Sequence, residues 1–408
     1  MAKWKQTPLH SCTIDLTENC NLRCTYCFTW GKTQRVLPEK LGKKIIDFFY
    51  DHFDNQGYAE ISFWGGEPLL EFELLKRLVK YAEKKLKGKV IFGGTTNGTL
   101  LDEDKLKFLT DHNCKMLLSL DGNREHHNKF RVYPNGQGSY DDIIEKLPVI
   151  LKYWPDLRLR FSLTPELIPI LPNVIENLYK EGVKYFIFSP VYELEWKDND
   201  FKLLEKKLKL ILKFLKEHQD VTVQQIQDPI SSPPQEYPCG AGRSYVGFGV
   251  DGTIAPCHRF RKYGLNYVTW NQKIYIGHVD HGFYPLREIF IDFPIIRKEQ
   301  CSECEAYYFC GGGCYAINYE LSGHIFGFVP YLCKYEKTIA KIVKHERKQI
   351  IGTKPPQNQS CICYNACYLE NTPNEIRHVD PSANFACMCF NTNYQGKLDD
   401  QFRPLINR

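Results

Sequence analysis

The chain has 408 residues, 43% of them hydrophobic and 25% charged, which is enough to build two or three compact domains with buried cores. It contains no run of about 18 or more apolar residues, and its start, MAKWKQTPLHSCTIDL, lacks the order of basic, apolar and small residues seen in a signal peptide. We therefore expect a cytoplasmic protein without membrane partners. The net charge of +5 is spread over many lysines and does not indicate nucleic acid binding.

The chain has 17 cysteines, and most fall in clusters with only a few residues between neighbours. In an exported protein such spacing would suggest disulfides. Thiols stay reduced in the cytosol, however, so close spacing in a long cytosolic chain indicates metal binding or catalysis.

Residues 11–191 alternate between short β-rich runs and amphipathic segments, which is typical of parallel strands joined by helices. We predict six strands: SCTIDLT from Ser11, AEISFWG from Ala59, KVIFGGTTNG from Lys89, CKMLLSLDG from Cys114, RLRFSLT from Arg158 and KYFIFSPV from Lys184. The segments between them have the 3.6-residue period of helices. Six such units predict an α/β fold, a partial (β/α)6 barrel of the TIM type.

The region after the sixth strand changes in character along the chain. A helix rich in leucine and lysine is predicted at 199–217, and QQIQDPISSPPQ has the composition of a linker. GFGVDGTIAPC predicts a hairpin that turns at Asp251 and Gly252, and YEKTIAKIVKHERKQII a helix that ends at Gly352. We therefore expect the barrel at 1–222, a small cysteine-rich domain with short hairpins and helices at 223–352, and an irregular tail at 353–408.

The segment TENCNLRCTYCF follows the first predicted strand and contains Cys20, Cys24 and Cys27. A loop with this spacing can supply thiolates to three corners of an iron–sulfur cubane. Structural zinc sites usually need four protein ligands, whereas three thiolates leave one iron open to a small molecule. The end of a barrel strand is also where such folds keep their active sites.

This spacing, with the aromatic Tyr26 before the last cysteine, resembles the signature of the radical S-adenosylmethionine (SAM) superfamily. The resemblance implies a 4Fe-4S cluster whose open iron binds SAM. It also implies that one electron from the cluster cleaves SAM to methionine and a 5′-deoxyadenosyl radical, which abstracts hydrogen from the substrate. By this resemblance Cys20, Cys24 and Cys27 are both metal ligands and catalytic residues.

Two further segments at strand ends support the resemblance. Gly65, Gly66 and Glu67 resemble the glycine-glycine-glutamate motif that receives the amino group of SAM. Bare glycines let backbone approach a ligand, and a carboxylate suits an ammonium. Ser119 and Arg131 resemble residues that reach the ribose and carboxylate of the cofactor. Taken alone, the first segment could be an ordinary strand-to-helix turn, and the second pair could serve packing and surface charge.

Seven more cysteines follow in the order of the SPASM domain, which accompanies the radical core in peptide- and protein-modifying members of the superfamily. The resemblance implies two auxiliary 4Fe-4S clusters, three clusters in all. It assigns the second auxiliary cluster to Cys301, Cys304, Cys310 and Cys333. It assigns the first to Cys239, Cys257 and Cys314. Zinc remains the alternative metal.

The sequence departs from the sulfatase-maturating branch at two positions. That branch has an extra cysteine six positions after the first SPASM cysteine and an aspartate, acting as base, directly after the second. Here these positions are Tyr245 and His258. The departure argues against oxidation to formylglycine and implies an open iron at the first auxiliary cluster, unless another part of the chain supplies a ligand. In thioether-forming maturases such a site is thought to bind the substrate's cysteine thiolate, a good soft ligand.

The polar tail at 353–408 has few aliphatic residues with which to build a core. Its cysteines are Cys361, Cys363, Cys367, Cys387 and Cys389. The tail is a further metal module, an appendage or a fused substrate, because cysteine-rich ribosomal peptides have this composition. Because the first cluster motif begins at residue 20, we expect no N-terminal leader-binding domain in this chain, so another protein or the core itself would have to recognise a leader peptide. A tethered substrate would need none, since tethering raises its effective concentration.

The remaining candidates divide into core and rim residues. Cys12 and Cys114 fall within predicted strands and are expected in the core. His126, His127 and His258 either face the cavity or, as is more usual for lone histidines, are structural or exposed. Tyr192 and Glu193, in the segment SPVYELEW, follow the sixth strand at the rim of the barrel. From this position alone we expect them to contact the substrate.

Together these features predict a radical SAM peptide maturase. Its substrate would be a cysteine-containing ribosomal peptide, in which it forms a thioether crosslink of the sactipeptide or ranthipeptide type. A reductant such as ferredoxin or flavodoxin would supply the electron. Members with the same domains also make carbon–carbon links, epimerise residues or oxidise side chains, and fold does not choose among these outcomes. A non-catalytic iron–sulfur protein of electron transfer is the alternative from another class.

Overall fold

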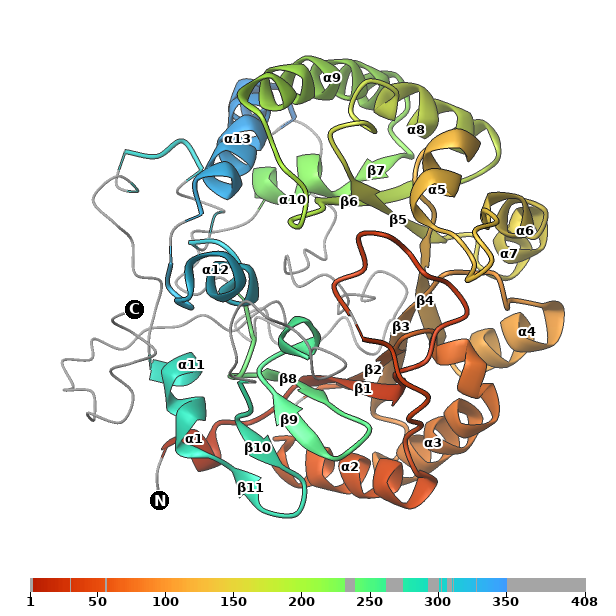
Figure 1. Cartoon of the computed structure of the whole chain (residues 1–408), viewed down its shortest axis with the longest axis vertical. Coiled ribbons are helices and arrows are strands. Elements are labelled where there is room, and N and C mark those ends of the chain that lie inside the picture. Colours follow the sequence, from red (N-terminus) through yellow and green to blue (C-terminus); the bar gives the residue numbers. More distant parts are fainter. Residues whose placement is uncertain are drawn as a thin grey trace.

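The computed structural model describes residues 3–29, 31–55, 57–231, 239–261, 274–292, 301, 303–306, 310, 312–327 and 329–350. The predicted tail at 353–408, with its cysteines, lies outside the described residues. So do residues 232–235 of the predicted linker. The described strands form one sheet that curves through the molecule, with helices around its outer side (Figure 1).

All six predicted strands are present and lie side by side in one parallel sheet. They are β1 (Ser11–Thr17), β2 (Ala59–Gly65), β3 (Val90–Thr96), β4 (Cys114–Ser119), β5 (Arg158–Leu163) and β6 (Tyr185–Pro190). Each strand pairs in parallel with the next, from Cys12 opposite Ile61 to Phe161 opposite Phe188. The expected fold of β/α units is therefore confirmed. Because all these strands run in the same direction, their carboxyl ends meet at one edge of the sheet.

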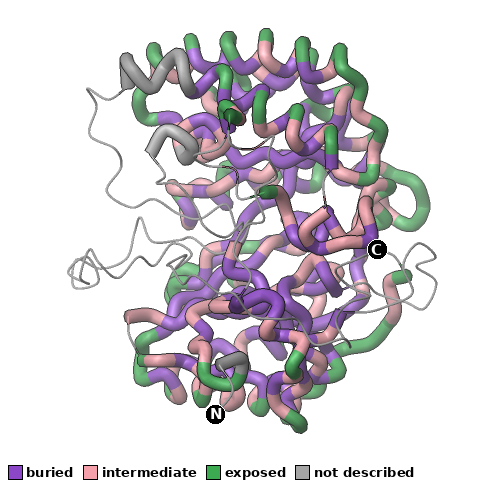
Figure 2. Tube along the Cα trace, turned by 90° about the vertical axis from the view of Figure 1, so that its left-hand side faces the viewer, coloured by how far each residue is buried: buried purple, intermediate pink, exposed green. Residues whose placement is uncertain are grey.

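Amphipathic helices connect these strands and cover the outer side of the sheet (Figure 1). They are α2 (Glu39–His52), α3 (Phe72–Lys85), α4 (Glu103–Asp111), α5 (Arg124–Phe130), α6 (Tyr140–Ile144), α7 (Leu147–Tyr153), α8 (Leu171–Lys180) and α9 (Asp198–Glu217). Their apolar faces pack on the strands, as Ile45 and Phe49 do in α2. Figure 2 shows this division, with exposed positions on the outer turns of the helices.

The same sheet continues into the cysteine-rich region. Further strands are β7 (Thr222–Val223), β8 (Tyr245–Phe248), β9 (Thr253–Ala255), β10 (Gly277–His278) and β11 (Gly282–Phe283). The predicted hairpin is confirmed as β8 and β9, with Gly252 in its turn at φ +83°. Sequence reasoning did not foresee that β8 pairs in parallel with β1, with Tyr245 opposite Ser11. Segments on both sides of the predicted boundary near residue 222 thus share one sheet.

Part of the predicted linker is helical. The helix α10 (Gln224–Ser231) occupies the start of this segment. Its glutamine side chains hydrogen-bond to the backbone of the sheet. Gln225 accepts a hydrogen bond from the backbone of Phe188 on β6 at 2.9 Å, and Gln227 one from Val223 at 2.6 Å. Side-chain amides therefore fasten this helix to the sheet, a contact that composition alone does not reveal.

The remaining helices are short except for the last. They are α1 (Lys3–Gln6), η1 (Pro68–Glu71), η2 (His258–Phe260), η3 (Pro285–Arg287), α11 (Glu288–Asp292), α12 (Tyr315–Ser322) and α13 (Pro330–Ile350). The predicted helix near 335–351 is confirmed within α13, which begins earlier, at Pro330, and packs on α9 and α10. None of the helices described in the structure is both long enough and apolar enough to span a membrane.

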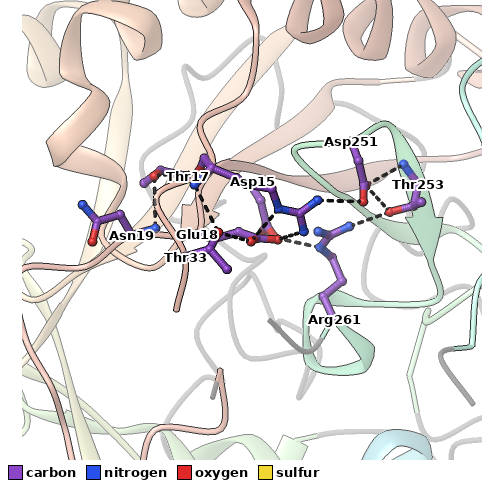
Figure 3. A network of polar contacts seen from close by, with 9 residues as sticks. Asp15, Thr17, Glu18, Asn19, Thr33, Asp251, Thr253 and Arg261 are labelled. Carbon is purple, nitrogen blue, oxygen red and sulfur yellow. Dashed lines mark hydrogen bonds and ion pairs between the residues drawn. The ribbon is translucent and has the colours of Figure 1, made fainter. Parts of the chain in front are cut away.

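A polar network joins the end of β1 to the β8–β9 hairpin (Figure 3). Arg261 donates to Asp15 at 2.7 Å and to Thr253 at 3.2 Å. Glu18 is an ion-pair partner of Arg35, which also lies 3.5 Å from Asp251. Asp15 and Glu18 are almost fully buried, so the network fixes both ends of the long loop after β1 against the hairpin.

We predict that Arg261→Met destabilises the protein by about 3–5 kcal/mol, because it leaves the buried Asp15 carboxylate without its ion-pair partner. Urea unfolding followed by circular dichroism measures the effect. Lys44→Met is the matched control, since the Lys44–Asp280 pair is exposed and should contribute less than about 1 kcal/mol. Equal losses in the two variants would contradict the role given to the buried pair.

Candidate active site

The loop that follows β1 carries Cys20, Cys24 and Cys27. Its ends are held together, because Glu18 N–H donates to Arg35 O at 2.9 Å and Leu37 N–H to Leu16 O at 2.9 Å. Within the loop, Cys27 N–H donates to Cys24 O at 3.1 Å, which closes a turn between the last two cysteines. The backbone thus brings three thiols from one short segment to the carboxyl end of the sheet.

Burial and charge act in opposite directions on these thiols. Burial raises the pKa of Cys20, and it raises the pKa of Cys24 to about 12. The cation of Lys32 lowers both pKa values, and Arg131 also lowers that of Cys24. The Cys27 thiol raises the pKa of both Cys20 and Cys24, Cys20 also raises that of Cys24, and all three thiols raise the pKa of Lys32. Lys32, which sequence reasoning missed, is therefore the cation that faces the three cysteines.

The three cysteines could hold a four-iron cluster. Among the residues that the structure describes, no three Cys, His, Asp or Glu side chains gather closely enough to hold one metal ion. A four-iron cluster is larger than an ion, so thiolates that bind its corners stand further apart. Metal binding would also supply the positive charge that these buried thiols need to lose their protons.

The glycine segment after β2 lies directly against the cysteine loop. Gly66 N–H donates to Thr17 O, and Glu67 N–H to Asn19 O, each at 2.9 Å. Gly65 has φ +138°, and a Cβ on it would lie 2.2 Å from Thr17 O. A Cβ on Gly66 would lie 2.0 Å from Asn19 O and 3.0 Å from the Cβ of Cys20. Glycine is therefore required for this close backbone approach, and the segment is more than an ordinary turn.

The side chain of Glu67 is buried and makes hydrogen bonds within the protein. It accepts from Leu69 N at 3.1 Å, Thr96 Oγ1 at 2.8 Å and Asn97 N at 2.7 Å. Burial raises the pKa of this carboxyl to about 7, and the hydrogen bonds counteract the rise. Glu67 thus ties the ends of β2 and β3 together, and its contact with the amino group of SAM stays a prediction.

Asn97, just after β3, is a site residue that sequence reasoning missed. Its amide donates to Asn21 Oδ1 at 2.9 Å and approaches Cys20 Sγ at 4.0 Å. The signal was available, because TTNG ends a predicted strand, where polar residues meet the active-site edge.

Arg131 is buried, so its interpretation as a surface charge is wrong. It donates to Asp121 Oδ2 at 2.7 Å and to Ser162 at 3.2 Å, and Tyr26 hydrogen-bonds to the same aspartate. The guanidinium lies 5.5 Å from the centre of the Tyr26 ring. Asp121 follows β4 directly, and it joins the cysteine loop to this part of the rim. Ser119 is buried at the end of β4, close to this group.

The histidines after β4 and the two strand cysteines have structural roles. His127 accepts from Asp121 N at 3.1 Å, and its other ring nitrogen lies 3.0 Å from Ser139 Oγ. The ring of His126 lies 2.8 Å from Thr164 Oγ1. Cys12 and Cys114 are fully buried, as expected for core residues.

The later cysteines fall into two groups. Burial raises the pKa of Cys333, on α13, to about 11, and the thiols of Cys301 and Cys304 raise it further. The pKa of Cys310, raised to about 12 mainly by burial, also responds to Cys333. These four thiols therefore lie near one another. Cys314, at the start of α12, belongs to other surroundings, where burial raises its pKa and Arg259 lowers it.

Cys239 and Cys257 both lie next to the hairpin of β8 and β9. Cys239 comes shortly before β8, and Cys257 directly follows β9 and precedes η2. These two predicted ligands therefore flank the same hairpin. That they bind one cluster together with Cys314 stays a prediction.

Tyr245 and His258 contact each other. The Tyr245 hydroxyl lies 2.8 Å from His258 Nδ1 and 3.3 Å from Thr13 Oγ1 on β1. The imidazole centre is 4.5 Å from Trp64 at the end of β2 and 6.2 Å from Phe28 in the cysteine loop. Burial, with Arg259 and Arg160, lowers the pKa of His258 to about 3. His258 is thus a neutral residue beside the cysteine loop.

The rim residues Tyr192 and Glu193 are bound by the cysteine-rich region. Arg259 forms ion pairs with Glu193 and, at 3.1 Å, with Glu320 on α12. Tyr331 donates to Tyr192 O at 2.8 Å. These contacts hold the loop after β6 against α12 and α13, and substrate contact by the two rim residues stays a prediction.

Comparisons with known proteins agree with this geometry. Residues 14–165 match the Radical SAM superfamily. The cysteine-type anaerobic sulfatase-maturating enzyme of Clostridium novyi is 24% identical over 331 residues, which cover 73% of this chain and 85% of that enzyme. The structure of native anSMEcpe with bound AdoMet and Cp18Cys peptide matches with a TM-score of 0.71 at 21% identity, covering 85% of this chain and 100% of that one.

A second solved structure with a peptide is also similar. SuiB of Streptococcus suis bound to the precursor peptide SuiA matches with a TM-score of 0.54 at 18% identity, covering 76% of this chain and 72% of that one. At this level of identity the structural matches show a shared fold, and they confirm the expected α/β architecture.

We predict that Gly65→Ala removes the first cluster, because the new Cβ would collide with Thr17 O and push the glycine segment off the cysteine loop. Iron and sulfide analysis after anaerobic reconstitution should show a loss of roughly four irons per chain. Gly136→Ala is the control. Gly136 also has positive φ, at +85°, but a Cβ there would meet nothing within 4 Å. Full iron content in Gly65→Ala would refute the prediction.

We also predict that His127 makes the fold sensitive to acid. Burial lowers its pKa to about 3, below the usual value near 6.5, so its contribution to stability is present above pH 6.5 and is lost as the pH falls toward 3. The loss is of the order of 4 kcal/mol. Urea unfolding of His127→Gln between pH 7 and 4 should show a flatter pH dependence than the wild type. A wild-type slope in His127→Gln would contradict this prediction.

Proposed function

We propose that this chain, whose residues 14–165 match the Radical SAM superfamily, modifies a cysteine-containing peptide by forming a thioether crosslink. The observation that carries the proposal is the contact of the glycine segment with the cysteine loop, combined with a Tyr–His pair where sulfatase-type members have a cysteine and an aspartate. The first feature supports SAM chemistry, and the second supports a distinct outcome.

In this proposal Cys20, Cys24 and Cys27 hold the first 4Fe-4S cluster. When bound, the cluster supplies the electron that cleaves SAM. SAM is received by Tyr26, Gly65, Gly66, Glu67, Ser119 and Arg131. The contacts of Gly65 and Gly66 support this assignment, because their bare backbone lets the glycine segment lie directly against the cysteine loop. Arg131 is held in place by Asp121, so its guanidinium keeps one orientation.

The proposed auxiliary sites follow the same reasoning. Cys301, Cys304, Cys310 and Cys333 would hold the second auxiliary cluster, and the mutual effects of their thiols support this set. Cys239, Cys257 and Cys314 would hold the first. Tyr245 is tied to His258 and is no thiolate, which supports an open iron at that cluster.

A peptide is the substrate class that the relatives favour. One matched structure contains the Cp18Cys peptide, and another the precursor peptide SuiA. In the proposed reaction the acceptor carbon would lose one hydrogen atom to the radical that SAM supplies, the cysteine thiol would lose its proton, and the cysteines assigned above would hold the cluster that accepts the remaining electron. A carbon–sulfur bond forms, and the peptide loses two hydrogens for each link.

The cysteine-rich tail at 353–408 is a candidate for this peptide, because it offers several thiols on the same chain. A separate ribosomal peptide is the alternative substrate. A ferredoxin or flavodoxin is the proposed reductant.

The test is mass spectrometry of the anaerobically reconstituted protein before and after incubation with dithionite and SAM, while 5′-deoxyadenosine is followed. We expect deoxyadenosine together with a loss of two hydrogens per link in a fragment from 353–408, at thiols that no longer react with an alkylating reagent. Cys24→Ala should abolish deoxyadenosine. Cys114→Ala, a core cysteine, is the control and should retain it.

The other outcomes of this measurement identify the competing functions. Deoxyadenosine with an unchanged tail would direct the search to a separate peptide. Loss of two hydrogens with all thiols still free would indicate a carbon–carbon link or an oxidation. If a protein with full iron content forms no deoxyadenosine, the proposal is overturned. The remaining hypothesis is then a non-catalytic electron-transfer protein.

A further inference from the structure

The outer side of α9 carries a straight row of lysines. The row consists of Lys202, Lys206, Lys209, Lys213 and Lys216, and all of these residues are exposed. Their spacing alternates between four and three residues, which places them on one face of the helix over about four turns. The opposite face holds buried residues, among them Leu204 and Leu208. The row therefore faces solvent, and packing inside the protein does not account for it.

The helix α13 adds a second set of lysines beside the first. Lys334, Lys337 and Lys341 are exposed on α13, which packs on α9 (Figure 1). Lys334 forms an ion pair with Asp198 of α9, and Lys341 lies 3.8 Å from Glu205 of the same helix. Each of these partners lies seven residues after the previous one, so the two helices run in the same direction with their lysines side by side. We call these eight lysines the α9–α13 lysine surface.

The charge of the α9–α13 lysine surface is far from balanced. From Lys202 to Lys216, α9 has six lysines and a single acidic residue, Glu205. One carboxylate cannot neutralise six ammonium groups, so the surface attracts anions. A lysine ammonium keeps its water shell on a flexible stem, whereas the planar fork of arginine suits fixed, bidentate contacts. A surface made of lysines therefore fits a partner that arrives by electrostatic attraction and leaves again.

Cys333 places this surface next to an assigned cluster ligand. It lies in the first turn of α13, directly before Lys334 and one helical turn before Lys337. The residue is half-buried, so it lies at the edge of the core. A protein that delivers electrons must come close to the group that receives them, because electron tunnelling weakens steeply with distance. A carrier seated on the lysines around Cys333 would meet this requirement.

Two other anionic partners fit the surface less well. Helices that bind membranes combine cations with exposed large apolar side chains. Among the large apolar residues described on α9 and α13, only Leu210 is exposed. Proteins that bind nucleic acids use arginine for phosphate and base contacts. Neither α9 nor the described side chains of α13 include an arginine. An acidic protein is therefore the partner that this surface favours.

We propose that an acidic electron-transfer protein docks on the α9–α13 lysine surface and delivers one electron to the site of Cys333. The inference rests on the proposed function, which assigns Cys333 to the second auxiliary cluster and requires a reductant. In the transfer the reduced partner loses one electron and the cluster that Cys333 would hold gains it, with no bond made or broken. Docking by charge gives a short-lived complex, which suits a carrier that must leave after each transfer.

The experiment uses the anaerobically reconstituted full-length protein and a reduced, acidic bacterial ferredoxin as the probe. A carbodiimide joins carboxylates directly to amines, and mass spectrometry then locates the joined lysines. Stopped-flow absorbance measures the bimolecular rate of ferredoxin oxidation at low and high ionic strength. We expect crosslinks on the α9–α13 lysine surface and a rate that falls at least about tenfold as salt screens the charges.

A triple variant removes three charges from the surface without touching a cluster ligand. In Lys206→Gln, Lys213→Gln and Lys337→Gln combined, we expect the ferredoxin rate at low ionic strength to fall at least about tenfold. The crosslinks should weaken in parallel. All three positions are exposed, so the variant should fold and keep its iron. Its iron content and circular dichroism spectrum check this.

The matched control removes the same charge from another part of the protein. Lys40→Gln, Lys80→Gln and Lys84→Gln combined change exposed lysines of α2 and α3, and the ferredoxin rate should stay within about twofold of the wild type. Equal slowing in the two triple variants would reduce the effect to net charge and overturn the inference. Crosslinks confined to other surfaces, or a rate that ignores salt, would also overturn it.

Two further outcomes separate this inference from its alternatives. Phosphatidylserine vesicles or duplex DNA that bind through these lysines, while ferredoxin does not crosslink to them, would assign the surface to another class of partner. The proposed function fails separately, because crosslinking detects docking without any turnover. A protein that docks ferredoxin on the lysines but links no peptide would refute the thioether reaction and retain the docking surface.

Discussion

The active-site edge depends on the two backbone hydrogen bonds between the glycine segment and the cysteine loop. Gly66 and Glu67 donate to Thr17 and Asn19, and only glycine leaves room for this approach. Neighbouring strands are connected to the same contact. Glu67 accepts a hydrogen bond from the backbone of Asn97, just after β3, and Tyr26 of the cysteine loop hydrogen-bonds to Asp121, just after β4. The position of each predicted ligand of the first cluster therefore follows from how β1 and β2 end.

The sequence was sufficient to predict the parallel strands, the helices between them, and the two short segments that meet after β1 and β2, but it missed Lys32 and Asn97 beside them. Strand and helix periods are local signals, and parallel topology then brings the strand ends to one edge. The cysteine spacing and the glycine pair are local as well, because both are short segments after a strand. Their contact could be expected from the order of β1 and β2 alone.

The contacts that sequence could not reveal are those between distant segments. Nothing near Tyr245 indicates that β8 lies beside β1, since this pairing joins residues more than two hundred positions apart. The bond from Tyr245 to His258 and the burial of Arg131 against Asp121 depend on such tertiary placement. The helix α10 was missed for the same reason, because its glutamines are satisfied by backbone of β6 and β7.

The parallel pairing of β1 with β8 has a consequence for electron transfer. The loop of Cys20 continues β1, and Cys257 follows the hairpin that β8 begins. Strand hydrogen bonds therefore set the separation between the cysteine loop and Cys257. With the clusters proposed above bound at both places, electrons would tunnel between them across a constant separation during every turnover. Gating of this electron flow would then come from the substrate and its ligation.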